Sequence, residues 1–345
     1  MNWTKSNLRF PFIRSCIKPE PLAGISNLID ILILSDCLET LKMGNCTDNI
    51  LERVCKACSD LRILDISNSL LVTDKSITAI TSLKQLEALD VFGTSITPEG
   101  TECLLQSLPS KIHTIGCNHL SDLHRFHKLK SLHAGINRCN AILPYLQHLN
   151  LSSGNFDDIT GLLGNQLVHL QLNHCKSVDV SVIIRKCTSI EVFEMHSCSY
   201  SMGLHQALRD INSGFKKLRH FILDNSSKFP SYPNIDRMVI FSALRSAEYV
   251  REIQVQSYAN FDEGFFSQLM RSCSLKYLDI IYIHTIYSEM IQPDLLRNLL
   301  VKCLNISELN VRGLLKYDVE DLKLQFRSEF PGVRVNFEIM DPSGF

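Results

Sequence analysis

Apolar residues recur along most of this chain in the pattern L-x-x-L-x-L-x-x-N/C, in which other apolar residues can replace leucine. The copy that begins at Leu167 continues with Leu170, Leu172 and Cys175. Apolar residues two positions apart indicate a short β-strand with one buried face. Further copies begin at Ile29, Leu61, Leu86, Ile112, Leu129, Leu146, Ile190, Leu218, Val250, Leu275 and Ile306, and Phe330, Val333 and Val335 suggest a closing strand.

The segments between these strands differ in length, and the length indicates what each contains. Most starts are separated by 20–32 residues, near the interval of about 20–29 residues typical of leucine-rich repeats. The two 17-residue steps, 112 to 129 and 129 to 146, are too short for a full helix and predict extended or 3₁₀ chain. Apolar spacing and the Thr97-Pro98 start signal predict helices at 49–59, from 98, and at 182–187, 265–273, 295–303 and 319–326.

A strand and helix of this kind cannot bury their apolar faces alone, so successive pairs must stack into one continuous core. We therefore predict an α/β fold, a leucine-rich-repeat solenoid (horseshoe) with a parallel concave sheet and convex helices. Residues 28–345 form the repeat domain, with about twelve irregular repeats and a C-terminal cap, and residues 1–27 form an N-terminal cap or docking segment. A solenoid also accommodates 345 residues, whereas a single globular core stops growing near about 250–300.

The thirteen cysteines follow the repeat rather than a disulfide framework. Their number is odd, and cysteine suits small buried sites, so we expect free, reduced thiols. Cys55 and Cys58 have the Cys-x-x-Cys spacing of redox and zinc motifs, but both fit the buried face of the helix at 49–59, and no second pair completes a site. Six cysteines occupy two recurring positions: Cys37, Cys175 and Cys198 close the pattern, and Cys58, Cys187 and Cys303 lie three residues before a copy.

Charge and hydropathy argue against two classes of partner. Lys and Arg total 35 against 36 Asp and Glu, a net charge of -1, which gives no electrostatic reason to expect nucleic acid or an anionic membrane. No apolar run approaches the roughly 18 residues of a membrane span, and residues 1–16 lack the pattern of a signal peptide. We expect a reduced protein in the cytoplasm or nucleus, with neither nucleic acid nor membrane as partner.

A helix that ends in Cys-x-x-Leu, or in Cys-x-x-Ile, and leads into the repeat pattern occurs at 58–61, 187–190 and 303–306. Over roughly residues 28–340, the chain resembles the cysteine-containing leucine-rich repeats of F-box/LRR proteins and of Zyg/Zer-type substrate receptors. Those families recruit substrates to cullin–RING ubiquitin ligases. The resemblance implies a protein-interaction module that serves as a substrate-recognition subunit, with a cullin adaptor as a further partner. Residues 1–28 contain no recognisable F-box, so a leucine-rich-repeat scaffold or inhibitor without a ubiquitin link remains the alternative.

Catalytic motifs are missing from the sequence. It contains no G-x-S-x-G, H-E-x-x-H or phosphate-binding loop, and no G-x-G-x-x-G in a suitable context. We therefore predict that the chain is not an enzyme, has no catalytic residues and needs neither a cofactor nor a metal.

The residues between the apolar positions of each strand should face outward on the concave side. Acidic residues recur there, with Arg312 as the only base, and histidines gather in the middle repeats. The face is either a solvated polar surface, a mildly acidic surface for a basic or amide-rich protein, or a metal site on the histidines. We expect the acids to face solvent. The candidate partner-binding residues are Asp65, Asp90, Phe92, His148, His169, Gln171, Glu194, His196, Asp224, Glu252, Tyr277 and Asp279, with Ile281 as a further apolar anchor.

Two long segments interrupt the repeats. Asp224–Arg237 is polar and contains two prolines, and Ile281–Pro293 lies in a 31-residue interval. Long loops on solenoids often contribute to binding, but loops without a role fit the sequence equally well.

Overall fold

The computed structural model describes residues 38–120, 123–135, 141–209, 214–225, 233–272, 275–285, 291–313 and 319–338. These residues belong to two compact units, 1–146 and 147–345. Every strand pair in both units is parallel, and strand order follows chain order. The predicted α/β leucine-rich-repeat architecture with a parallel sheet is therefore confirmed.

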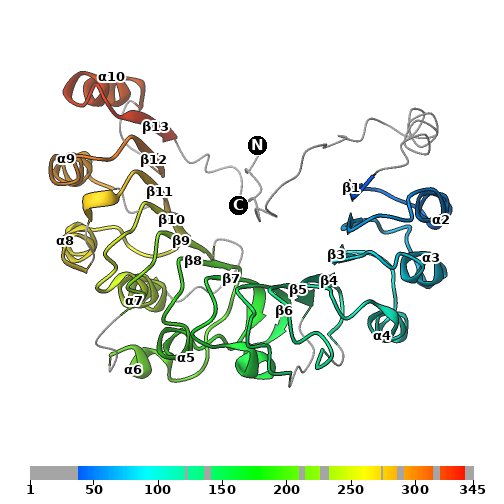
Figure 1. Ribbon diagram of the computed structural model, residues 1–345. Coiled ribbons are helices and arrows are strands. Elements are labelled where there is room, and N and C mark those ends of the chain that lie inside the picture. Colours follow the sequence, from blue (N-terminus) through cyan, green and yellow to red (C-terminus); the bar gives the residue numbers. More distant parts are fainter. Residues whose placement is uncertain are drawn as a thin grey trace. The chain divides into compact units, whose positions relative to one another are not determined.

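The described residues of the first unit contain five strands, with helices along one side of them (Figure 1). Leu41, Leu64 and Leu89 pair in register and are all buried. The strands are β1 (Thr40–Lys42), β2 (Ile63–Asp65), β3 (Ala88–Asp90), β4 (Thr114–Cys117) and β5 (Ser131–Gly135). The helices are α2 (Asp48–Ala57), the 3₁₀ helix η1 (Asp74–Ser76), α3 (Ile77–Thr81) and α4 (Pro98–Ser107).

In the second unit, the described residues contain eight strands and repeat this arrangement. Its strands are β6 (His148–Asn155), β7 (His169–Lys176), β8 (Val192–His196), β9 (His220–Asp224), β10 (Glu252–Ser257), β11 (Ile280–Thr285), β12 (Glu308–Arg312) and β13 (Arg334–Glu338). Its helices are η2 (Phe156–Leu162), α5 (Val180–Lys186), α6 (Leu204–Arg209), α7 (Pro233–Leu244), α8 (Glu263–Ser272), η3 (Leu275–Tyr277), α9 (Pro293–Lys302) and α10 (Val319–Glu329). In Figure 1, the labelled α-helices of this unit lie along one side of its strands.

The apolar positions of the pattern build the core between strands and helices. Leu170 in β7 and Phe193 in β8 pair in register and are fully buried. Helices begin where the sequence signals predict: Thr97 caps α4 by accepting the Gly100 N–H, and Pro98 follows in the first turn. All six predicted helices are confirmed, and the sequence pattern missed α3, α6 and α7.

The pattern missed one repeat near the start of the described residues. Leu38, Leu41, Met43 and Cys46 form a regular copy around β1, and 23 residues separate Leu38 from the next start at Leu61. The copy predicted at Ile29, which includes Cys37, lies outside the described residues, as does the segment predicted at residues 1–27.

The copy predicted at Leu275 was assigned three residues too early. Ile281 pairs in register with Ile253 and is fully buried, so this repeat begins at Leu278. Its intervals from Val250 and to Ile306 are then both 28 residues. The predicted role of Ile281 as an exposed anchor was wrong, because it faces the core.

The last strand and the short steps also agree with the pattern in outline. β13 closes the second unit, but its buried residues are Val335 and Phe337, so its start lies two residues later than Phe330.

The two 17-residue steps contain no helix in residues 118–120, 123–130 and 141–147.

The two long segments are partly helical. Arg237 lies in the first part of α7, and Pro293 begins α9. Residues 226–232 and 286–290 lie outside the described part.

Nine of the thirteen cysteines are described, and all nine are free thiols. Cys198 Sγ donates to the carbonyl oxygen of Leu172 at 3.4 Å, which links neighbouring repeats. Burial raises the pKa of Cys55 to about 12 and that of Cys187 to about 11. In the described chain, none of the helices has the length and apolar character that crossing a bilayer requires.

Candidate functional site

We call the sheet face opposite the helices the open face, and it carries the candidate residues. Parallel sheets are normally covered by helices on both faces. In the described ranges of each unit, helices lie along one side of the strands only (Figure 1). The side chains that alternate with the buried core positions therefore lie on the face that the described helices leave uncovered.

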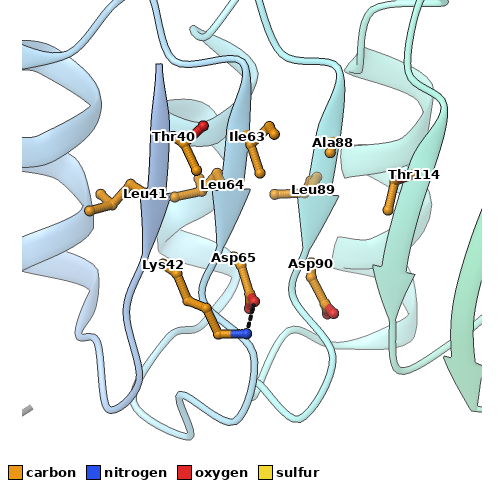
Figure 2. Close-up of a pocket in the computed structure, with 10 residues that line it drawn as sticks. All are labelled: Thr40, Leu41, Lys42, Ile63, Leu64, Asp65, Ala88, Leu89, Asp90 and Thr114. Carbon is orange, nitrogen blue, oxygen red and sulfur yellow. Dashed lines mark ion pairs between the residues drawn. The ribbon is translucent and has the colours of Figure 1, made fainter. Parts of the chain in front are cut away.

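On the first unit, the open face carries a row of charged side chains from neighbouring strands. Asp65 on β2 and Asp90 on β3 pair in register, and Lys42 Nζ on β1 lies 2.6 Å from Asp65 Oδ2. Figure 2 shows these three side chains along one edge of a pocket, with Ala88 and Thr114 among its other lining residues. The sequence pattern missed Lys42 because β1 was not predicted.

Asp90 also belongs to an aromatic cluster on the same face. Its Oδ1 accepts the Phe92 backbone N–H at 2.9 Å, and its Oδ2 lies 3.4 Å from His133 Nδ1. The Phe92 and His133 rings stack with centroids 3.9 Å apart. Gly116 lies between these strands, and a side chain there would overlap the Asp90 carboxylate. The four residues form an ordered carboxylate and aromatic surface.

On the second unit, Glu194 lies between two histidines. Its carboxylate oxygens are 3.4 Å from Nε2 of His169 on β7 and 3.4 Å from Nε2 of His196 on its own strand. Only 3% of Glu194 is exposed. Burial by itself raises the pKa of Glu194, but the two neighbouring histidines outweigh burial and lower the pKa to about 2. The Glu194 carboxylate is therefore charged and held in place at neutral pH.

Polar side chains continue from this cluster across β6 and β7. The rings of His148 and His169 lie side by side, with centroids 6.0 Å apart, as strand spacing predicts. Burial lowers the pKa of His148, and His169 lowers it further. Asn173 donates to Asn150 at 2.8 Å, and Gln171 donates to Asn173 at 3.2 Å. These hydrogen bonds fix the amide groups relative to the histidines.

A second carboxylate–histidine pair links β9 and β10. His220 Nδ1 lies 2.9 Å from Glu252 Oε2. The hydrogen bond from His220 is the main reason why the pKa of Glu252 is lowered. Asp224, at the end of β9, lies in register between His196 and Gln256. Asp90, Glu194 and Glu252 are thus each paired with a histidine on another strand of the open face.

Two candidate residues do not lie on the open face. Tyr277 ends η3, before β11, and stacks on Tyr249 with ring centroids 5.9 Å apart. Asp279 also precedes β11 and accepts the Ser307 hydroxyl. Both predictions followed from the misplaced Leu275 copy. Tyr282 and His284, which the sequence did not single out, take their positions on the face.

The expectation that the acids face solvent was also wrong for three of them. Asp65 and Asp90 are each 7% exposed, and Glu194 is 3% exposed. Arg312 is not the only base, because Lys42 lies on the open face too, and so does Arg334, whose Nη1 is 3.7 Å from Glu308 Oε2. Within the described ranges, His, Cys, Asp and Glu side chains form no group of three or more that could hold a metal ion.

Comparisons with known proteins give likenesses of fold. No protein-family model matches the chain, and no curated protein matches it. Among solved structures, an internalin (inlF) from Listeria monocytogenes is 13% identical with a TM-score of 0.50, covering 92% of this chain and 90% of its own. A chain in the complex of Rad7 and Elc1 from yeast is 14% identical with a TM-score of 0.54, covering 91% and 87% respectively. At this identity, what the chain shares with these proteins is its solenoid fold.

Proposed function

We propose that this chain is a protein-interaction module whose open face binds a basic or amide-rich segment of another protein. The observation that carries the proposal is a parallel sheet whose described helices lie on one side only, with ordered polar side chains on the other. Solenoids use such extended faces for binding. The proposal assigns the chain no catalytic step, and it places the protein in the cytoplasm or nucleus.

Charge on the second unit favours a basic partner over an acidic one. With histidines counted as neutral, Arg312 and Arg334 oppose five acids on the open face of β8–β13. These acids are Glu194, Asp224, Glu252, Glu308 and Glu338. Pairs such as Glu252 with His220 already hold their side chains in place, so a partner loses less side-chain entropy on binding.

We propose further that the module is the substrate-recognition subunit of a cullin–RING ubiquitin ligase. Two observations support this role: the Cys-x-x-Leu/Ile segments at 58–61, 187–190 and 303–306, and the likeness of fold to a structure of Rad7 in complex with Elc1. A scaffold or inhibitor without a ubiquitin link is the alternative, and it uses the same face.

Purification of the tagged full chain from its own cells, with quantitative mass spectrometry of what accompanies it, separates the two roles. The ligase proposal expects a cullin or cullin adaptor to be enriched over an empty-tag control. The matched control is the Leu170→Ala chain. Its weakened repeat packing should reduce the recovery of specific partners and leave the recovery of non-specific proteins unchanged. Repeated recovery of other partners with neither cullin nor adaptor would overturn the ligase role and favour the scaffold.

A further inference from the structure

Three neighbouring side chains on the open face of β10–β12 contain buried polar atoms without hydrogen-bond partners. Gln256, His284 and Arg312 pair in register, so they form one row across three strands. Oε1 of Gln256, both ring nitrogens of His284 and Nε of Arg312 are buried and make no hydrogen bond within the described structure. His284 is 7% exposed. Buried polar atoms are nearly always hydrogen-bonded, so four in one row require an explanation.

The chemistry of these four atoms defines their complement. Burial, reinforced by the charge of Arg312, lowers the pKa of His284 to about 4, so its ring is neutral at pH 7. A neutral imidazole has one donor and one acceptor nitrogen. Nε of Arg312 is a donor, and Oε1 of Gln256 is an acceptor. The row therefore presents two donors and two acceptors.

A primary carboxamide matches this set. It carries two N–H donors and an oxygen with two lone pairs at the same end of a side chain. An ionised carboxylate only accepts and an ammonium only donates, so each would leave half of the row unpaired. Asp224 and Glu338 flank the row in register, and Nε of Arg312 is 3.7 Å from Glu338 Oε2. These acids further disfavour a carboxylate ligand.

We propose that the Gln256–His284–Arg312 row binds the side-chain carboxamide of an asparagine or glutamine in the partner protein. This inference rests on the proposed function and names the chemistry of one contact on the open face. Gln256 and Arg312 have long side chains that are partly exposed, so they can move aside to admit the carboxamide. Tyr282 and Ile280, on the same strand and face, are also partly exposed and offer apolar contact beside it.

The free protein provides the first test, because unpaired buried groups lower stability. His284→Phe replaces the ring with an apolar one of similar shape and should raise the midpoint of thermal unfolding. The control is His205→Phe on α6, which lies in an exposed helix position and should leave the midpoint unchanged. A lower midpoint for His284→Phe would mean that the ring is already satisfied in the free protein, and it would overturn the inference.

Selection of a phage-displayed random heptapeptide library on the full chain provides the second test. The inference expects enriched peptides with a shared asparagine or glutamine. Changing that residue to the matching acid or to leucine should weaken a synthetic peptide about tenfold or more, and His284→Phe should weaken the original peptide to the same extent.

Enriched peptides that do not depend on the carboxamide, or that bind His284→Phe unchanged, would overturn the inference. If such peptides still lose affinity for a Glu252→Gln chain, the open face remains the binding surface and the proposed function stands. A library that yields no open-face binder counts against both the carboxamide inference and the proposed function.

Discussion

The carboxylate of Asp90 occupies the space above Gly116 that any side chain at that position would need. Gly116 follows Asp90 in register on the next strand. The absence of a side chain there lets Asp90 lie flat on the sheet and reach His133. The first unit therefore depends on a glycine for the geometry of its candidate binding surface.

Gly116→Ala should displace Asp90 and lower the free energy of unfolding. We expect a loss of about 1–3 kcal/mol, since the new methyl group meets the carboxylate, measured from urea unfolding curves. Gly44→Ala is the control, because a side chain there has no heavy atom within 4 Å. Equal stability for the two variants would contradict the placement of Asp90.

Leu170→Ala should leave a cavity in the core of the second unit. Leu170 is fully buried, and such truncations cost roughly 2–5 kcal/mol. Leu324→Ala on α10 is the matched control, because Leu324 is 63% exposed and should cost little. Chemical denaturation followed by circular dichroism distinguishes the two, and similar midpoints would mean that the repeat register is wrong.

Glu194 makes stability depend on pH in a defined window. Its pKa in the folded protein is about 2, below the ordinary value of 4.5, so the unfolded chain takes up the proton first as pH falls. Its stabilisation is complete above about pH 4.5 and is lost between there and pH 2. Glu194→Gln should be less stable than wild type at pH 7, and the difference in their free energies of unfolding should shrink as the pH falls from 4.5 to 2. A gap that stays constant down to pH 2 would contradict the histidine pairing.

His284 makes stability depend on pH over a higher pH range than Glu194 does. Its folded pKa of about 4 lies below the ordinary 6.5, so between these values the unfolded chain binds more protons. Wild-type stability should therefore fall as the pH drops from about 6.5 towards 4, because the ring must stay neutral to remain buried. Thermal unfolding of His284→Phe should depend less on pH than wild type between 6.5 and 4, and an unchanged dependence would contradict the burial of this ring.

Cys103 should react first among the nine described thiols. It is the exposed one, whereas the other eight are buried, and burial raises the pKa of Cys46 and Cys55 to about 12, which suppresses the reactive thiolate. Brief alkylation of the native protein, followed by peptide mass spectrometry, measures the order. Early labelling of Cys55 or Cys187 would contradict the structure.

The sequence predicted the fold well because each repeat buries apolar residues at the same positions of its strand. Where it erred, two readings satisfied the pattern equally. Leu275-x-x-Leu278-x-Ile280 matches the template as closely as Leu278-x-x-Ile281-x-Ile283, and only the register with Ile253 decides between them. The equal 28-residue intervals were the available signal.

The candidate site was less predictable, because it depends on contacts between strands. The alternation of apolar and polar positions correctly placed Glu194, His169 and His196 on one face. They did not indicate that Glu194 would be almost fully buried between the two rings. The nitrogens of His284 are likewise buried and unpaired beside Gln256 and Arg312, its neighbours in register, which the order of residues alone does not reveal.

The central claim is that partners bind the open face and not the helices, and paired charge removals test it most directly. Glu252→Gln with Glu308→Gln removes two acids from the open face. Glu52→Gln with Glu320→Gln removes two exposed helix acids, each of which likewise has a basic partner. The measurement is quantitative mass spectrometry of proteins recovered from lysate with each chain. If partners bind the open face, the face variant should recover about tenfold less of at least one specific partner, and the helix variant should recover it in full. Full retention of every partner by the face variant would contradict the claim.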